Sequence, residues 1–315
     1  MAEIGKNIAH AADLLRSGEI VGIPTETVYG LAGNSLDEQA LVKIFDAKNR
    51  PKFDPLISHI GDKTQLSDLV RDVPDKAQIL IDAFWPGPLT ILLDKQNHIS
   101  DLLTSGLSRM AVRIPNHPMT LKLLREIEFP LAAPSANPFG FVSPTTAEHV
   151  NDQLGNKIPY VLDGGSCEVG LESTVVGFDQ DKVVIHRLGG LSVEEIEKVV
   201  GEVTLELNKS SNPDAPGQLK SHYSPGSPVI IGDITTELAK HKERKVGVIS
   251  FSEDFQVPNQ IILSDKGDIS EAAQKIFNAL RQMRKMGVEL IISQKFPDEG
   301  LGRAINDRLE RASVQ

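Results

Sequence analysis

The segment Ile20-Val-Gly-Ile-Pro-Thr-Glu-Thr-Val-Tyr-Gly30 decides the fold class, because a short apolar run leads directly into a polar turn. The run Ile20–Ile23 predicts a buried strand that Pro24 ends. The turn then places two hydroxyls, a carboxylate and a phenol after that strand, where open α/β sheets tend to bind ligands. The same residues would equally build a turn held by its own side chains and a helix cap. Composition alone does not separate these two interpretations.

Helices are predicted on both sides of this segment. The apolar spacing of residues 8–15 indicates a helix that stops at Gly18. Ser35 and Glu38 form a capping-box pattern for a second helix. That helix cannot pass Arg50, because a proline disfavours helical geometry in the residue before it. We therefore expect helix, strand, turn and helix in this order.

The same alternation continues along the first two thirds of the chain. Further strands are predicted at Pro55–Ile60, Leu89–Leu93, Met110–Ile114, Leu131–Ala133, Tyr160–Leu162, Thr174–Phe178 and Val183–His186. Further helices are predicted at Ala77–Phe84, Met119–Ile127 and Leu191–Val200. The pattern is mixed α/β, and the many prolines and glycines between the strands predict irregular connections.

A linker is predicted at Lys209–Gly226, which contains three prolines, two glycines and four serines without a long apolar run. The strands expected after it lie at Pro228–Gly232, Val246–Phe251, Gln260–Leu263 and Val288–Ser293, and the helices at Ile269–Met286 and Gly302–Ala312. Strands that alternate with helices predict a small parallel sheet of the doubly wound type. We therefore expect a catalytic domain at 1–207, a linker at 208–227 and a small α/β domain at 228–315.

Composition narrows the class of protein. The chain has 315 residues and a net charge of −10, which argues against a protein that coats nucleic acid. Cys167 is the single cysteine, so an intramolecular disulfide is excluded and a reducing compartment is expected. No apolar run is long enough to span a membrane and the N-terminus has no signal pattern. These features predict a cytoplasmic protein.

Several charged residues stand where a ligand or a structural partner would explain them. Lys48-Asn-Arg50-Pro-Lys52 puts three cations just past a helix end, where they would bind an anion or complement the helix dipole. Arg113 interrupts an apolar run, so it must face a ligand anion or a protein carboxylate. Arg109 would share its side of the strand, and His59, inside another strand, is either structural or catalytic.

Hydroxyl and amide groups follow other predicted strands. Ser135 and Asn137 lie in a proline-flanked turn that would either bind a ligand or hold itself together. Ser143 and Glu172-Ser-Thr174 are further clusters of this kind. The chain has no P-loop, no zinc-ligand spacing, no complete dinucleotide fingerprint and no nucleophile elbow.

Taken together, these motifs resemble the YrdC-like family. The motifs that carry the resemblance are Pro24-Thr-Glu-Thr-Val-Tyr-Gly-Leu31, Lys48-x-Arg50, Pro55-Leu-Ile-x-His59, Arg113-x-Pro115, Ser135-x-Asn137, Gly170-Leu-Glu-Ser-Thr174 and Arg187. The string Pro216-Gly-x4-His222-Tyr-Ser-Pro225 and the ending Leu301–Leu309 resemble the long, two-domain threonylcarbamoyladenylate synthases within it. This resemblance implies an N-terminal twisted mixed sheet with a concave basic pocket and a smaller Rossmann-like C-terminal domain.

The resemblance also implies a reaction, in which L-threonine, bicarbonate and ATP form threonylcarbamoyl-AMP and pyrophosphate. The product would pass to separate proteins that transfer the threonylcarbamoyl group to tRNA. The resemblance places threonine beside Thr27, His59, Arg113, the backbone of Ala133, and Ser173. It places ATP beside Lys48, Arg50, Asp54, Arg109, Ser135, Asn137, Ser143, Arg187 and Tyr223. Lys48 and Arg50 are the expected catalytic cations, and Mg²⁺ is expected with ATP, although its ligands are not indicated.

One position departs from the family pattern. Asp54 stands where the family commonly has asparagine, and a carboxylate near phosphates would repel them unless it faces the ribose, the adenine amino group or Mg²⁺. The second domain has no catalytic cluster of its own, so we expect it to cover the pocket together with the linker, with His222 and Tyr223 touching the nucleotide. The alternatives are a tRNA-binding module that uses Lys48–Lys52, and a nucleotide hydrolase that is indifferent to threonine.

Overall fold

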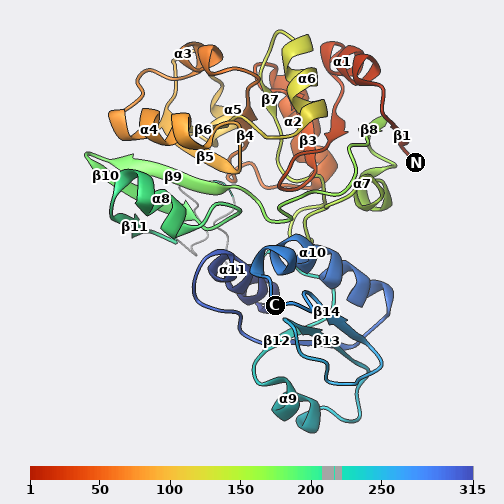
Figure 1. Ribbon diagram of the computed structural model, residues 1–315. Coiled ribbons are helices and arrows are strands. Elements are labelled where there is room, and N and C mark those ends of the chain that lie inside the picture. The colour runs from red at the N-terminus through yellow and green to blue at the C-terminus, as the bar shows by residue number, and fades with distance from the viewer. Residues whose placement is uncertain (208–215, 217–221, 315) are drawn as a thin grey trace.

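The computed structural model describes residues 1–207, 216 and 222–314. Two sheets organise this part of the chain, one in each of two units that lie against each other (Figure 1). The linker predicted at Lys209–Gly226 lies mostly outside the described residues. None of the described helices combines the length and the apolar character that crossing a bilayer requires.

Within the described residues, the first sheet has eleven strands in the order β1-β8-β2-β3-β7-β4-β6-β5-β9-β10-β11. Parallel and antiparallel pairs alternate irregularly in it, which confirms the mixed sheet predicted from the sequence. Its strands are β1 Glu3–Gly5, β2 Val21–Ile23, β3 Gly30–Asn34, β4 Ile57–His59, β5 Leu89–Asp94, β6 Arg109–Arg113, β7 Leu131–Ala132, β8 Tyr160–Leu162, β9 Thr174–Asp179, β10 Lys182–Arg187 and β11 Val203–Leu205.

Helices surround this sheet (Figure 1). They are α1 Ile8–Arg16, α2 Glu38–Lys48, the 3-10 turn η1 Lys63–Gln65, α3 Leu66–Leu69, α4 Asp75–Phe84, α5 Asp101–Thr104, α6 Pro118–Glu126, α7 Ala147–Leu154 and α8 Val193–Val200. Helix α2 ends at Lys48, before Pro51, as predicted. Asn49 caps the helix in the left-handed conformation, with φ 51°.

Two local predictions around the polar turn were wrong. The turn does not lead into a helix, because Gly30–Asn34 forms β3 and pairs antiparallel with β2, so that residues 24–29 are a hairpin loop. The predicted capping box at Ser35 and Glu38 is also absent. Asp37 caps α2 by accepting a hydrogen bond from the Gln39 amide at 2.9 Å, since the strand delays the start of the helix.

The second sheet is all parallel and has the order β12-β15-β13-β14, which confirms the predicted doubly wound type. Its strands are β12 Val229–Ile231, β13 Val246–Ser250, β14 Gln260–Ile262 and β15 Leu290–Ser293. Helices α10 Ile269–Lys285 and α11 Leu301–Ser313 lie between this sheet and the first unit, and α9 Ile234–Lys240 lies on the far face (Figure 1).

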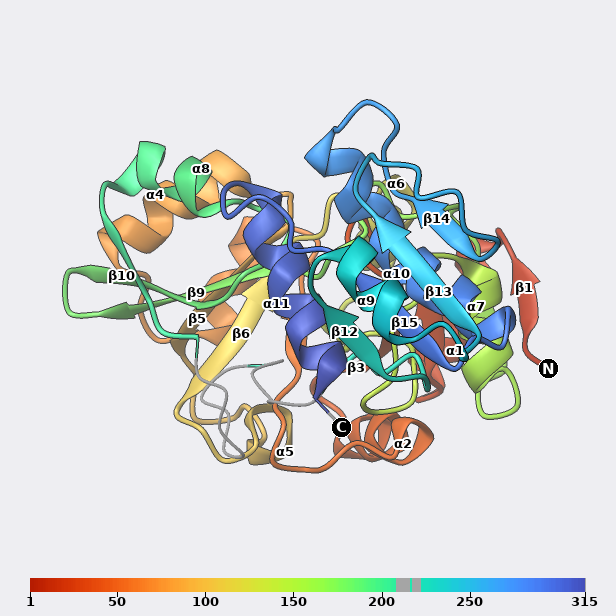
Figure 2. The ribbon, with the colours of Figure 1, turned by 90° about the horizontal axis from the view of Figure 1, so that it is seen from below.

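The two units share one apolar core. A single cluster of buried side chains includes Leu171 of the first unit together with Phe277 of α10 and Ile305 of α11. Seen from below, α11 crosses in front of the middle of the first unit (Figure 2). Burial of apolar surface on both sides therefore fixes α11 against the first unit, which brings its charged residues to the site described next.

Candidate active site

A cavity of about 60 Å³ lies where the β2–β3 loop meets the carboxyl ends of β4 and β6. It collects most of the residues predicted for the two substrates: Thr27, Arg50, Asp54, His59, Arg113, Ala133, Ser135, Ser173, Arg187 and Tyr223. Pro216 and His222 complete one wall. Residues from widely separated parts of the chain thus meet around one cavity.

Arg113, the last residue of β6, is 3% exposed and has a carboxylate partner. Its Nη2 donates to Glu26 Oε2 at 2.7 Å and its Nη1 donates to the Thr27 hydroxyl at 3.0 Å. Both partners belong to the β2–β3 loop. The structural interpretation of Arg113, an internal ion pair, is therefore correct, and its guanidinium still lines the cavity.

The β2–β3 loop is held in shape by its own hydrogen bonds and also lines the cavity. The Thr25 hydroxyl accepts hydrogen bonds from the Thr27 and Val28 amides, both at 3.2 Å, and so builds the turn that composition allowed. Tyr29 donates its hydroxyl proton to the Gly165 carbonyl at 2.8 Å and points away into the interior. Thr25 and Thr27 remain on the cavity wall.

His59 lies beside Arg113, because β4 and β6 are parallel neighbours with His59 and Arg113 in register. Burial, and then the adjacent positive charge of Arg113, lower the pKa of His59 to about 3. The imidazole is therefore neutral at physiological pH. It contributes hydrogen-bonding groups to the cavity, while the positive charge of that wall comes from Arg113.

Arg50 and Asp54 form a buried pair that also lines the cavity. The Nη2 atom of Arg50 lies 2.8 Å from Asp54 Oδ2, and the guanidinium also donates to the backbone carbonyls of Asp54 and Pro55. This pairing explains how a carboxylate is tolerated at position 54, since the guanidinium neutralises it.

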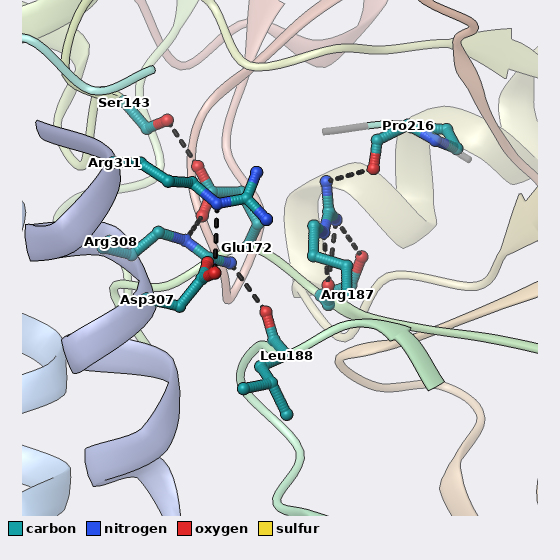
Figure 3. Close-up of polar contacts among 9 residues, drawn as sticks. Ser143, Glu172, Arg187, Leu188, Pro216, Asp307, Arg308 and Arg311 are labelled. Atoms are coloured by element: carbon teal, nitrogen blue, oxygen red, sulfur yellow. Dashed lines mark hydrogen bonds and ion pairs between the residues drawn. The ribbon is translucent and has the colours of Figure 1, made fainter. Parts of the chain in front are cut away.

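Arg187, the last residue of β10, holds the backbone around Ser173. Its Nε and Nη2 donate to the Ser173 carbonyl at 3.0 and 2.8 Å, and Nη1 donates to the Pro216 carbonyl at 3.3 Å (Figure 3). The last contact ties residue 216 to the cavity wall. Burial lowers the pKa of Arg187 to about 10, so the side chain stays charged at neutral pH.

Glu172 is a cavity residue that the second unit contacts. Its Oε1 accepts the Ser143 hydroxyl proton at 2.6 Å, and its Oε2 accepts from Nε of Arg308 at 2.9 Å (Figure 3). Burial by itself would raise the pKa of this carboxyl, but the charges of Arg308 and Arg187 and these hydrogen bonds outweigh it and lower the pKa to about 2. Glu172 is therefore ionised, and α11 supplies its counter-charge.

The Glu172–Arg308 contact is part of a larger buried network. Arg308 also donates to Asp307 Oδ2 at 2.6 Å and to the Leu188 carbonyl at 2.8 Å, and Arg311 Nε donates to Asp307 Oδ1 at 3.0 Å (Figure 3). The two arginines project from one face of α11 toward the first unit. Because each buried charge has an opposite partner, the network is tolerated in the interior.

His222 and Tyr223 form the rest of the cover. Tyr223 is 1% exposed, stacks on Phe277 of α10 with the ring centroids 5.3 Å apart, and lies under the Arg308 guanidinium. Its φ of 66° lies in the left-handed region, which non-glycine residues rarely adopt. Burial lowers the pKa of His222 to about 3, so this wall carries no imidazolium.

Lys48 lies behind the wall of the cavity. The side chain is 1% exposed, and Nζ donates to the backbone carbonyls of Ser135 and Asn137, both at 2.5 Å. Burial and the neighbouring charge of Arg50 lower its pKa well below the ordinary value. In this arrangement Lys48 holds the Ser135–Asn137 turn against α2.

Three other predicted nucleotide residues do not line the cavity. Asn137 turns its amide to the carbonyls of Pro138 and Phe141, which is the self-held turn considered above. Ser143 reaches the site through Glu172. Arg109 begins β6, whereas Arg113 ends it, so the two lie about 13 Å apart along the strand.

The charges of the cavity are mixed. The guanidiniums of Arg50, Arg113 and Arg187 share its walls with the carboxylates of Asp54 and Glu172. The basic pocket that the resemblance implied is therefore not shown. Across residues 1–207, 216 and 222–314 there is no cluster of three histidine, cysteine or acidic residues able to hold a metal, and both cavity carboxylates already face arginines.

The sequence did not reveal which residues form ion pairs with the charged side chains around the cavity. Glu26 lay inside the quoted turn, and Arg308 lay inside the quoted C-terminal ending, but neither was given a role. The signal for Glu26 was the need of a buried Arg113 for a counter-charge. Arg308 is 136 residues from Glu172, and nothing in the local pattern of either residue indicates that separation.

Comparison with known proteins places the chain in a family. A family model described as "Telomere recombination", covering Sua5, YciO and YrdC, matches residues 13–189. A second, "Threonylcarbamoyl-AMP synthase, C-terminal domain", matches residues 191–314. The chain is 42% identical over 318 residues to a threonylcarbamoyl-AMP synthase of Pyrococcus abyssi, covering 96% of this chain and 93% of that protein. It is 40% identical over 320 residues to one of Bacillus subtilis, covering 97% and 92%.

The fold agrees with these matches. A crystal structure of P. abyssi Sua5 complexed with L-threonine superposes with a TM-score of 0.94 at 40% identity, covering 99% of this chain and 97% of that chain. Both sheets and the helices between them therefore have counterparts in a single relative. The chain belongs to the Sua5/YrdC family of threonylcarbamoyl-AMP synthases, in the two-domain form.

Proposed function

We propose that this chain joins L-threonine, bicarbonate and ATP into L-threonylcarbamoyladenylate and releases pyrophosphate, as the first step of the threonylcarbamoyladenosine modification of tRNA. The observation that carries the proposal is the single cavity in which Arg113, Arg50 and Arg187 converge from separate segments. Threonine carries a carboxylate, bicarbonate and ATP are anions, and preorganised cations offset the repulsion between these negative groups.

The chemistry makes two bonds. The threonine amine bonds to the carbon of bicarbonate with loss of water, which gives a carbamate. A carbamate oxygen then bonds to the α-phosphorus of ATP, and the bond from that phosphorus to the β-phosphate oxygen breaks, so that pyrophosphate leaves. Neither step requires a covalent enzyme intermediate. The main tasks of the protein are to position the three reactants and stabilise charge.

We assign the threonine end of the cavity to the wall built from β4, β6 and the β2–β3 loop. Arg113 is the partner of the threonine carboxylate, and the Thr27 hydroxyl and neutral His59 orient the molecule. The Ala133 backbone and Ser173 complete this end. Arg113 is suited to the task because Glu26 and Thr27 fix its plane before threonine arrives.

We assign the other end to ATP. Arg50 and Arg187 bind phosphates, Ser135 contributes to the same end, and Asp54 orients Arg50. Lys48 acts by holding the Ser135–Asn137 turn, and Ser143 by orienting Glu172. Asn137, Tyr223 and Arg109 are the remaining predicted nucleotide residues, and Arg109 has the weakest support because it begins the strand that Arg113 ends.

Mg²⁺ would accompany ATP as part of the substrate. The described residues offer no cluster of acidic ligands for a resident metal, and Asp54 and Glu172 are both paired with arginines. The phosphates themselves are the natural ligands for the ion, and neutralising their charge is the chemistry that it supplies.

The cover must move during a catalytic cycle. Pockets that hold molecules of nucleotide size usually measure about 300–1,000 Å³, whereas this cavity measures about 60 Å³. Pro216, His222 and Tyr223 form the wall that can move outward without disrupting the strand pairing of either sheet. Closure after binding would keep water from the reactive adenylate. We accordingly divide the chain into a catalytic domain at 1–207, a linker at 208–227 and a covering domain at 228–315.

An omission experiment tests the function. The protein is incubated with ATP, Mg²⁺, threonine and bicarbonate, one component is left out at a time, and the adenylate is sought by mass spectrometry. The adenylate should appear only in the complete mixture. ATP breakdown that is indifferent to threonine would instead identify a hydrolase, and salt-sensitive tRNA binding without turnover would identify an RNA-binding module.

The product is expected to pass to separate threonylcarbamoyl-transferring proteins. The adenylate is an activated intermediate, so a separate protein can use it as a substrate. A direct contact with tRNA and a cytoplasmic location both stay predictions from the sequence.

A further inference from the structure

A second and larger hollow lies between the two units. It measures about 440 Å³, which is within the range typical of small-molecule sites, and it lies between α7 of the first unit and α10 of the second. Phe141, Asp152, Pro225, Arg281, Arg284 and Lys285 form most of its lining. We call it the hinge groove, because the chain leaves the cover at Tyr223 and passes along it.

Three cations face the hinge groove. Arg281 is 9% exposed, Arg284 lies 5.1 Å above the Phe141 ring, and Lys285 pairs with Asp152 at 3.1 Å. His149 is neutral there, because burial and then Arg281 lower its pKa to about 4. The lining therefore carries three positive charges and one negative charge, within a protein whose net charge is −10.

Helix geometry explains only part of this cluster. Arg284 and Lys285 lie in the last turn of α10, where cations complement the helix dipole. Arg281 lies a turn earlier and is buried, and it docks the units by donating to the Val142 and Ser143 carbonyls and to Gln153 Oε1. Its remaining guanidinium nitrogen, Nη1, has no hydrogen-bond partner among the described residues.

The electrostatics favour an anion at that nitrogen. Burial lowers the pKa of Arg281 to about 10, Asp152 offsets part of this lowering, and the repulsion by Arg284 is the smallest of the three effects. Arg281 and Arg284 bring two guanidiniums to a groove whose one carboxylate, Asp152, already pairs with Lys285. Arg284 has no hydrogen-bond partner among the described residues and is held only against Phe141. A phosphate between the two guanidiniums would satisfy both, because it accepts bidentate hydrogen bonds.

We propose that the hinge groove is a binding site for a small phosphorylated ligand, with its phosphate held by Arg281 Nη1, Arg284 and Lys285. The groove lies between two units and next to Asp152, so it suits a compact anion better than the extended backbone of RNA, which needs a continuous basic surface. This site is separate from the cavity that the proposed function uses, and it does not depend on that function.

The position of the groove ties it to the active site. Arg281 contacts the Ser143 carbonyl, while the hydroxyl of the same serine contacts Glu172. The Ser224 amide donates to the Gly140 carbonyl at 2.8 Å, directly after the cover residue Tyr223. A ligand in the groove would therefore stabilise the arrangement in which the cover is closed, and binding at the two sites would be coupled.

Isothermal titration with inorganic pyrophosphate tests the proposal. Pyrophosphate resembles a product of the proposed reaction and should also enter the active site, so the wild-type protein should show two sites. Arg284→Glu should weaken one of them by about tenfold or more, since it replaces a cation at the phosphate with an anion. The variant should fold normally, because Arg284 is exposed. The matched control is Lys242→Glu, which makes the same charge change at an exposed position outside the groove.

The outcomes separate cleanly. Loss of one pyrophosphate site in Arg284→Glu, with both sites kept in Lys242→Glu, supports the proposal. If pyrophosphate does not bind in the active site and the wild type shows one site, loss of that site in Arg284→Glu supports the proposal equally. The proposal is overturned if Arg284→Glu weakens none of the pyrophosphate sites that the wild-type protein shows. Binding of a single-stranded RNA oligomer that depends on Arg284, with no such pyrophosphate site, overturns it as well and identifies an RNA surface.

Discussion

Glu172 is a single carboxylate whose ionisation links stability to pH. Its pKa falls from 4.5 to about 2 in the folded protein, so its stabilising effect is complete above pH 4.5 and is lost as the pH falls toward 2. A shift of this size corresponds to roughly 3 kcal/mol. We expect the difference in unfolding free energy between wild type and Glu172→Gln to shrink as the pH is lowered below 4.5. Urea denaturation between pH 7 and 3 measures it, and a difference that does not change with pH would contradict the assignment.

His59 gives a second prediction at this scale. Because burial and Arg113 hold its pKa at about 3, the imidazole does not titrate between pH 5 and 8. We expect His59→Gln to raise the KM for threonine while the shape of the curve of kcat/KM against pH stays that of the wild type. Steady-state kinetics over this range check it. An ionisation near pH 6.5 that is present in the wild type and missing from the variant would show that His59 acts as an acid or base.

The types of residue in the site could be predicted better than their contacts. The sequence indicated that Arg113 needed a carboxylate or a ligand anion, but not that Glu26, 87 residues earlier, supplies it. Asp54 appeared out of place until Arg50 was seen to pair with it at 2.8 Å. Pairings of this kind depend on sheet order and loop geometry, which a single sequence does not display.

Among the elements, α2 and the turn that it supports carry a testable role. Lys48 ends α2 and donates to the carbonyls of Ser135 and Asn137. Lys48→Met keeps the side-chain volume and removes both donors, so the turn should lose its position. We expect the KM for ATP to rise about tenfold and stability to fall by about 1–3 kcal/mol. Initial rates at varied ATP and thermal melts measure the two effects.

The matched control lies on the same helix. Lys43 bonds to the Gly18 carbonyl and to Glu19 at a partly exposed position. Lys43→Met should leave the KM for ATP within about twofold of the wild-type value. Equal effects of the two substitutions would show that Lys48 acts only through helix stability.

Element prediction succeeded where periodicity was strong and failed where composition misled it. The helices α1 and α10 and the four parallel strands of the second sheet follow clear patterns, and they were predicted within a few residues. Strand β3 was missed because Gly-Leu-Ala-Gly-Asn has the composition of a loop. Its pairing with β2 comes from the sheet around it, and tertiary context overrides local propensity there.

For the whole molecule, the important contact is the one between α11 and Glu172. Arg308→Met should destabilise the protein by about 3–5 kcal/mol, because it leaves a buried carboxylate without its counter-charge. The double variant Glu172→Gln with Arg308→Met should be more stable than the sum of the single changes implies, by about 1–3 kcal/mol. Unfolding free energies of the four proteins measure the coupling. Additive effects would show that α11 and the cavity are energetically independent.

The presence of two domains could be predicted from the sequence, because the proline-, glycine- and serine-rich residues 209–226 separate two stretches with different strand and helix patterns. The way in which the units fit together was not accessible. Helix α11 was predicted as an element, but the network of Arg308, Asp307 and Arg311 that it brings to the first unit depends on contacts more than one hundred residues apart. The −10 net charge likewise gave no sign that buried arginines meet around one cavity.

The central claim is that one cavity holds threonine at the Arg113 end and ATP at the Arg187 end. The direct measurement is the affinity of each substrate, by isothermal titration, for the wild type and for Arg113→Lys and Arg187→Lys, which keep the charge and lose the guanidinium fork. Arg113→Lys should weaken threonine binding by about tenfold or more while ATP binding changes less than about twofold, and Arg187→Lys should weaken ATP binding more than threonine binding, which it affects through Ser173 alone. If both variants weakened the two substrates equally, or neither substrate at all, the assignment of the two ends would be wrong.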